Sequence, residues 1–290
     1  MSENNISFSV DALVPADMAR KAEQVGVAKV NLGPFRMFAL AVLAGAFISA
    51  GAVFATTVTT GAAGELTFGV SKLLGGLVFC LGLILVIGAG AELFTGNNLI
   101  VMAWAGGKVS TGKLLQNWII VYIGNFVGSI VSAVGMFLSG QYLFAGGAVG
   151  LNALNIADGK MHYSFFQALM LGIFCNVLVC LAVWLAMGGR SATDKILGII
   201  FPITAFVAAG FEHSVANMYF IPVGLFIKAG APASFWAEIG KTTADYAGLT
   251  WANFFIANLL PVSIGNIIGG ALLVGLAYWF IYLRPSWTGR

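Results

Sequence analysis

The sequence predicts an all-α membrane protein with six transmembrane helices arranged as an inverted 3+3 repeat. Of its 290 residues, 14 are Lys or Arg and 11 are Asp or Glu, so charged residues make up 9% and hydrophobic residues 59%. A soluble domain carries about 25% charged residues. So few charges exclude a soluble, disordered or coiled-coil chain, and the formal net charge of +3 is too small to suggest a nucleic-acid partner.

Six apolar segments are long enough to cross a bilayer, which takes roughly 20 residues. They cover residues 37–60, 71–104, 114–140, 164–187, 196–228 and 250–283. We therefore expect a transmembrane channel domain over 37–284. A cytoplasmic N-terminal segment over 1–36 precedes it, and a cytoplasmic tail over 285–290 follows.

Basic residues set the orientation, because loops rich in Lys and Arg stay in the cytoplasm. Ten of them fall on one side of the predicted spans: Arg20, Lys21, Lys29, Arg36, Lys108, Lys113, Arg190, Lys195, Arg284 and Arg290. Four fall on the other side: Lys72, Lys160, Lys228 and Lys241. We expect both termini in the cytoplasm, with the loops over 61–70, 141–163 and 229–249 outside.

A short amphipathic helix is predicted before the first span. Pro15 suits its first turn, and Gly26 is expected to end it after Val25. Two interpretations are open. The helix is either an interfacial segment that rests on the membrane, or a cytoplasmic lid over whatever the spans enclose.

Two motifs occur once in each half of the chain, in the same order. The pattern G-x-E-x4-N begins at Gly90 in the second span and at Gly210 in the fifth, and the pattern G-N-x-x-G begins at Gly124 in the third span and at Gly265 in the sixth. This indicates a duplication of three spans, and an odd number places the second copy upside down in the membrane. The second and fifth spans are also unusually long and carry polar residues near the middle, which predicts broken helices.

The polar residues that recur in both copies are interpreted mainly as structural. Glu92 and Glu212 would satisfy backbone N–H groups that the breaks set free, and Asn97 and Asn217 receive the same interpretation. The alternative is a functional role, which is the default for a carboxylate at membrane depth. The G-x-x-x-G spacing of the second motif predicts close helix packing first and pore lining second.

Function is expected where the two copies differ. His213 stands where the first half has Leu93, and Thr95 stands where the second half has Val215. An imidazole titrates near physiological pH, so His213 is either a structural residue or the group that exchanges a proton with a substrate. Thr95 would bind that imidazole or the substrate.

Other chemistry is not supported by the residues present. The chain has two histidines, His162 and His213, and three cysteines, all inside apolar segments: Cys80, Cys175 and Cys180. No zinc or haem ligand set can be assembled from them. We expect no catalytic residue, no metal and no cofactor.

The helix ends at each break would direct partial positive charge toward the middle, which favours a small anion or its conjugate acid. Phe79, Leu83 and Phe206 lie near the breaks and are either ordinary packing or the walls of narrow apolar slits. Stripping water from an ion in such a slit costs of order 20 kcal/mol in the idealised limit. A neutral weak acid costs far less, so His213 could donate a proton and let the acid pass.

At Glu92-Leu-Phe-Thr95, at the segment from Glu212 to Asn217 and at the segment from Gly265 to Gly269, the sequence resembles the formate–nitrite transporter family. The resemblance extends from about residue 10 to residue 284. It is strongest to the formate channels, although Gly96 is reminiscent of the nitrite branch. It implies an aquaporin-like protomer with one pore, assembled as a homopentamer in the bacterial inner membrane.

The resemblance also implies residue roles along the pore. His213 would be the central protonatable residue with Thr95 as its partner, and the N-terminal helix would be a pH-sensitive gate. The remaining positions are Leu83 and Phe206 at an outer constriction with Phe79 nearby, Leu93 and Val179 at an inner one, Asn176 and Asn266 as anion contacts, and Lys160 attracting the anion at the external mouth.

We therefore expect a bidirectional, pH-dependent formate channel, proton-coupled through His213, that converts no substrate. Its partners would be a small monocarboxylate or similar weak-acid anion, the lipid bilayer and further copies of the chain. A nitrite or hydrosulfide channel of the same family is the alternative, and a membrane enzyme is the alternative from another class.

Overall fold

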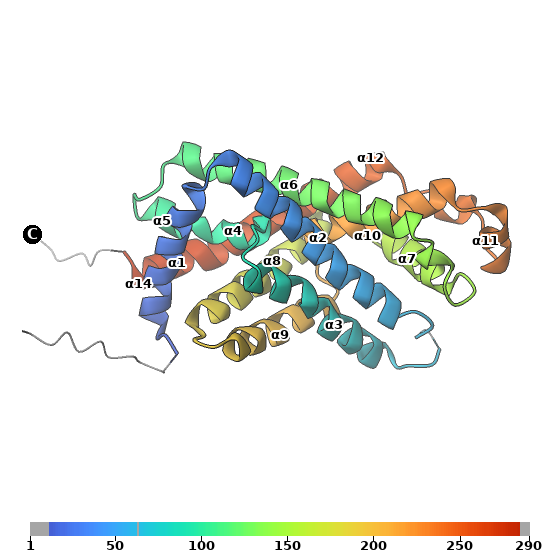
Figure 1. The fold of residues 1–290 in the computed structure, drawn as a ribbon, viewed down its shortest axis with the longest axis horizontal. Coiled ribbons are helices and arrows are strands. Elements are labelled where there is room, and N and C mark those ends of the chain that lie inside the picture. Colours follow the sequence, from blue (N-terminus) through green and yellow to red (C-terminus); the bar gives the residue numbers. More distant parts are fainter. Residues whose placement is uncertain (1–11, 63, 285–290) are drawn as a thin grey trace, which may run out of the picture.

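The computed structural model describes residues 12–62 and 64–284, and the chain folds into a bundle of helices. The predicted tail over 285–290 and the first residues of the predicted N-terminal segment therefore lie outside the described residues. Figure 1 shows α1 across one end of the bundle beside α5 and α14, with α7 and α11 at the opposite end. The long helices run between these two ends.

The first half of the chain contains the helices that precede and surround the first break. They are α1 (Pro15–Val30), α2 (Pro34–Val58), α3 (Phe68–Gly88), α4 (Phe94–Asn97), the 3-10 turn η1 (Asn98–Ile100), α5 (Val101–Ala105) and α6 (Thr111–Leu138).

The second half follows the same order with different connections. Its first elements are η2 (Gln141–Leu143), α7 (Ala148–Gly159), α8 (Phe165–Gly188), α9 (Ala192–Ala208), α10 (Ser214–Gly230), α11 (Ala233–Glu238) and η3 (Thr243–Tyr246). The last long helix is a continuous run of α12 (Trp251–Asn253), π-helix η4 (Phe254–Leu259), α13 (Leu260–Ile267), π-helix η5 (Ile268–Leu276) and α14 (Ala277–Tyr282).

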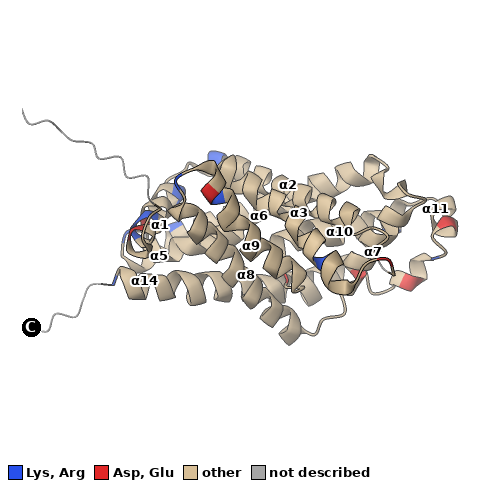
Figure 2. Cartoon of the chain, turned by 90° about the horizontal axis from the view of Figure 1, so that it is seen from below, with Lys and Arg blue, Asp and Glu red and all other residues tan. Residues whose placement is uncertain are grey.

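The helices cover the apolar segments that hydropathy identifies. Four of them, α2, α3, α6 and α8, are each long and apolar enough to cross a membrane, and so is the segment Thr243–Tyr282, which contains η3 and the last long helix. The fifth predicted segment is divided between α9 and α10. In Figure 2 the charged residues gather toward the two ends of the bundle, and most of its middle is uncharged. This distribution is what a bilayer-spanning bundle requires.

The N-terminal helix differs from the prediction, because it does not end at Gly26 but continues to Val30. A Cβ added at Gly26 would lie 3.2 Å from the Cβ of Ala103 and 3.4 Å from the Cα of Ile100. The glycine therefore permits close contact with the segment after the first break instead of stopping the helix. One face of α1 is buried against η1, α5, α8 and α14, so the helix packs on the bundle itself.

The glycines of the second motif bring neighbouring helices together, as their spacing predicts. A Cβ at Gly128 of α6 would lie 2.0 Å from the carbonyl oxygen of Val42 on α2. In the second half, a Cβ at Gly269 would lie 2.2 Å from the carbonyl oxygen of Ile173 on α8. Only glycine permits backbones to approach this closely. The motif therefore holds equivalent pairs of helices together in the two halves.

Candidate functional site

Two long helical segments are interrupted at corresponding places. Between α3 and α4, Gly90 adopts a left-handed backbone with φ +77°, and between α9 and α10, Gly210 does so with φ +75°. Glycine adopts this conformation without a steric penalty, whereas other residues rarely do. Each turn is followed by extended backbone, and a new helix begins after Leu93 in the first half and after His213 in the second.

Asn125 of α6 holds the first break in place. Its Oδ1 accepts a hydrogen bond from the backbone N–H of Phe94 at 2.9 Å. Its Nδ2 donates to the backbone carbonyls of Ala41 at 2.7 Å and Glu92 at 2.9 Å. One buried side chain thus ties together the start of α4, Glu92 within the break and the neighbouring α2.

Asn266 of α13 performs the same task at the second break. Its Oδ1 accepts from the backbone N–H of Ser214 at 2.9 Å, and its Nδ2 donates to the carbonyls of Gly172 at 2.7 Å and Glu212 at 3.0 Å. Both amide hydrogens are therefore used by the backbone. Asn266 borders neither of the two cavities described below, although the family resemblance implied a contact with the anion.

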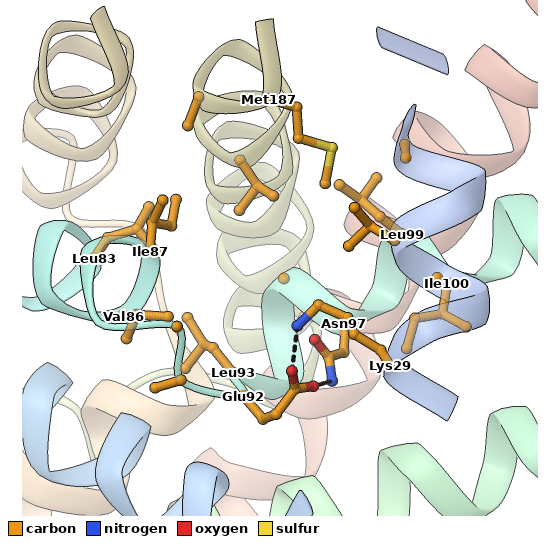
Figure 3. A pocket seen from close by; sticks show the side chains of 18 of the residues that line it. Lys29, Leu83, Val86, Ile87, Glu92, Leu93, Asn97, Leu99, Ile100 and Met187 are labelled. Atoms are coloured by element: carbon orange, nitrogen blue, oxygen red, sulfur yellow. Dashed lines mark hydrogen bonds and ion pairs between the residues drawn. The ribbon is translucent and has the colours of Figure 1, made fainter. Parts of the chain in front are cut away.

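The glutamates have other partners than the freed N–H groups that we expected. The Glu92 carboxylate accepts from Lys29 Nζ at 2.7 Å and from Asn97 Nδ2 at 2.7 Å, as Figure 3 shows. Asn97 also donates to Asn117 Oδ1 at 2.9 Å. The carboxylate joins the end of α1 to the first turns after the break, while Asn125 satisfies the backbone.

Glu212 is bound in an equivalent way. Its carboxylate accepts from Lys160 Nζ at 2.7 Å, Asn217 Nδ2 at 2.6 Å and Asn258 Nδ2 at 3.1 Å. Asn217 donates in turn to Asn258 Oδ1 at 2.7 Å. Each break thus has a cluster of one glutamate, one lysine and two asparagines.

Three members of these clusters were missed in the sequence: Lys29, Asn117 and Asn258. The spacing of the residues carried a signal. Asn258 follows Asn117 by 141 residues, which is also the offset between Gly124 and Gly265, and Lys160 follows Lys29 by 131 residues.

His213 and Thr95 meet between the two breaks. His213 Nε2 lies 2.9 Å from Thr95 Oγ1, and both side chains are buried. His213 Nδ1 accepts a hydrogen bond from the backbone N–H of Ala216 at 3.0 Å, so the imidazole caps α10. The proton of the neutral ring, assigned from these bonds, is therefore on Nε2 and is donated to Thr95. The ring also stacks on Phe206, with centroids 5.8 Å apart.

Two cavities approach this pair from opposite sides. The first, here called the His213 cavity, has a volume of about 360 Å³ and is bordered by His213, Phe79 and Phe206, whose two aromatic rings meet edge to face. The second, here called the Glu92 cavity, has a volume of about 330 Å³ and is bordered by Glu92 and, toward α1, by Lys21, Ala22, Val25, Gly26 and Lys29 (Figure 3).

The two cavities show on which side of the His213 and Thr95 pair each predicted pore residue lies. Leu93 borders the Glu92 cavity, and so does Leu83, which the resemblance placed at the other constriction with Phe206. Val179 and Asn176 are fully buried and border neither cavity. Asn176 donates instead to Asn98 Oδ1 at 2.8 Å, to the carbonyl of Asn266 at 2.7 Å and to the carbonyl of Thr95 at 3.3 Å.

A family model described as formate/nitrite transporter matches residues 16–280. The chain belongs to the formate/nitrite transporter family. Formate channel FocA of Escherichia coli (strain K12) is 50% identical over 276 residues, which cover 95% of this chain and 96% of that protein. FocA of Haemophilus influenzae is 44% identical over 95% of this chain and 97% of that protein. The resemblance drawn from the sequence motifs to this family, and within it to the formate channels, is confirmed.

Solved structures of the formate/nitrite transporter family show the same fold. One described as a pentameric formate channel with formate bound has a TM-score of 0.83 at 49% identity, covering 87% of this chain and 98% of that chain. One described as an FNT family ion channel has a TM-score of 0.78 at 29% identity, covering 91% and 98%. The protein is thus a multi-span membrane channel of this family, and its relatives are transporters and channels rather than enzymes.

Proposed function

We propose that this protein is a formate channel of the bacterial inner membrane that passes formate and formic acid in both directions, with proton exchange at His213. The observation that carries the proposal is the position of the His213 and Thr95 pair between two cavities that open from opposite ends. The similarity to FocA over nearly the whole chain supports formate as the substrate.

Proton exchange follows from the contacts of the imidazole. A charged imidazolium would need a proton on Nδ1, which faces the N–H of Ala216, so charging the ring separates that hydrogen bond. An anion next to Nε2 offsets this cost by favouring the charged ring. Formate then accepts the Nε2 proton, which leaves neutral formic acid and a neutral imidazole with its proton on Nδ1. Loss of that proton and reprotonation at Nε2 restore the hydrogen bond from Ala216. The neutral acid passes the apolar walls at a far lower desolvation cost than the anion.

The assembly and orientation belong to the same proposal. A pentamer is supported by the similarity to a solved pentameric formate channel. The excess of Lys and Arg on the side of both termini supports a cytoplasmic location for them. With this orientation the Glu92 cavity is the cytoplasmic one, α1 covers it, and the His213 cavity opens to the outside.

Uptake into proteoliposomes tests the proposal. Labelled formate, nitrite and hydrosulfide are compared at several external pH values over roughly pH 5–8, where an imidazole titrates. We expect wild-type formate uptake to vary several-fold with pH and His213→Phe to lose that dependence. The matched control is His162→Phe, because the His162 side chain is exposed, hydrogen-bonds to Asp158 and borders neither cavity. It should keep the wild-type profile.

Two results would contradict the proposal in different ways. If the wild type moves none of the three solutes faster than empty vesicles, the protein is not such a channel. If His213→Phe keeps the wild-type pH profile, the channel stands and proton exchange at His213 is wrong.

Nitrite is the second candidate substrate, and one residue favours it. Gly96 borders the Glu92 cavity directly after Thr95, and a Cβ there would only reach ordinary contact with Val183 at 3.5 Å. The glycine leaves the cavity without the hydroxyl group that formate channels more often carry. Faster uptake of nitrite than of formate in the same vesicles would reverse the order of the two substrates.

A further inference from the structure

The charges that border the His213 cavity do not act alike. Three charged side chains border it: Lys72, Lys160 and Glu212. Lys160 and Glu212 form an ion pair at 2.7 Å, and their side chains are only 15% and 2% exposed. The opposite charges of a buried pair this close nearly cancel at a distance. The net charge of the cavity is therefore +1, and it comes from Lys72.

Lys72 has no hydrogen bond or ion pair with any residue in the described part of the chain. Its Nζ lies over the ring of Phe68, 5.5 Å from the centroid, and the side chain is exposed. The two remaining basic residues predicted on this side are engaged elsewhere. Lys228 donates to two backbone carbonyls, and Lys241 lies 3.9 Å from a carboxylate oxygen of Asp245.

The position of Lys72 suits long-range attraction. Lys72, Gly75 and Phe79 follow one face of α3 at the spacing i, i+3, i+7, and all three border the cavity. Seven helical residues rise about 10 Å, so the charge stands roughly that far outside the Phe79 ring. Low-dielectric walls around such a cavity focus the field and raise the local concentration of oppositely charged solutes.

We propose that Lys72, and not the ion-paired Lys160, is the positioning residue that concentrates small anions in the His213 cavity before they reach the aromatic constriction. This inference rests on the proposed transport of an anionic substrate. At about 10 Å, a unit charge enriches a monovalent anion about two- to seventeenfold, for an effective dielectric constant between 80 and 20. The same Coulomb attraction acts on formate and nitrite, because it requires only their charge.

Salt dependence separates this role from a structural one. Initial uptake of dilute labelled formate is measured in uncharged phosphatidylcholine vesicles at fixed pH, at low ionic strength and then with an impermeant salt, sodium gluconate. The Debye length falls from about 30 Å at 0.01 M to about 3 Å at 1 M, so the added salt screens a charge 10 Å away. Wild-type uptake should fall with salt.

The variants are Lys72→Gln, Lys72→Arg and, as the matched control, Lys241→Gln. At low ionic strength Lys72→Gln should lower uptake about two- to seventeenfold, with a weakened salt dependence and convergence with wild type at high salt. Lys72→Arg keeps the charge and should behave as wild type, and so should Lys241→Gln, whose side chain lies outside the cavity.

A Lys72→Gln variant with the wild-type rate and the wild-type salt response would overturn the role of Lys72 and leave the channel proposal intact. If the wild type carries nitrite but not formate, the formate proposal fails, and the same comparison made with nitrite decides the role of Lys72. If neither anion crosses, both proposals are overturned.

Discussion

At the scale of single residues, two asparagines hydrogen-bond the irregular backbone at the helix breaks, next to which the two cavities lie. Asn125 and Asn266 each accept from one freed N–H and donate to two carbonyls, and both side chains are fully buried. An amide can do both, whereas a carboxylate can only accept. That difference explains why the glutamates, which the sequence suggested for this task, bind lysine and asparagine donors instead.

Replacing Asn125 by Ala should destabilise the protein strongly. The change leaves the N–H of Phe94 and the carbonyls of Ala41 and Glu92 without this partner, and each orphaned buried group costs about 1–3 kcal/mol. The measurement is the thermal unfolding midpoint of the purified protein in detergent. Asn253→Ala is the control, because that side chain is exposed and makes one bond to the carbonyl of Gly248. Equal midpoints for the two variants would show that Asn125 does not support the break.

At the scale of helices, hydropathy predicted the segments well and their ends less well. A bilayer requires a minimum apolar length, so 114–140 corresponds closely to α6 (Thr111–Leu138). Gly26 was misinterpreted because a glycine that ends a helix and a glycine that permits close packing look the same in sequence. The helix α7 (Ala148–Gly159) was expected to be a loop, since a segment of 12 residues is too short to be recognised as a span.

Two glycines of α6 should respond in opposite ways to Ala. At Gly128 the added methyl group would meet the backbone oxygen of Val42 at 2.0 Å, and backbone cannot move aside as a side chain can. We expect a loss of at least about 1–3 kcal/mol in stability. At Gly135 nothing lies within 4 Å, so Ala should be neutral or stabilise the helix by up to about 1 kcal/mol.

Thermal midpoints of Gly128→Ala and Gly135→Ala, measured side by side, check the assignment. Because both changes occur in the same helix and have the same chemistry, their difference reports the contact with α2. A Gly128→Ala variant as stable as Gly135→Ala would mean that the two helices are not held at this distance.

At the scale of the whole molecule, the duplication determines where the site lies. The two motifs were sufficient to predict an inverted repeat, but not to find its lysines. The glutamates are 120 residues apart, the lysines 131 and the second asparagines 141, because the connections between equivalent helices differ in length. Aligning the two halves of the sequence at one fixed offset therefore finds only part of each cluster, and the remaining members are identified from their contacts. For the same reason the ion pair between Lys160 and Glu212 was not predicted from the sequence.

The repeat predicts that the two lysine–glutamate pairs behave alike when broken. Lys160→Met leaves the Glu212 carboxylate buried without a cation. Removing one partner of a buried ion pair lowers the free energy of unfolding by about 3–5 kcal/mol. Adding Glu212→Gln removes the stranded charge and keeps a carbonyl oxygen for Asn217 and Asn258. The double variant should therefore be more stable than Lys160→Met alone.

Lys29→Met with and without Glu92→Gln should repeat this pattern with a smaller first loss. The Lys29 side chain is 24% exposed against 15% for Lys160, so water compensates more of the missing cation. Unfolding midpoints of these four variants, of Glu212→Gln and Glu92→Gln alone and of the wild type complete both double-mutant cycles. Double variants no more stable than the single lysine variants would show that the pairs matter for their geometry rather than for neutralising charge. The two halves of the channel would then be related in shape but not in energetics.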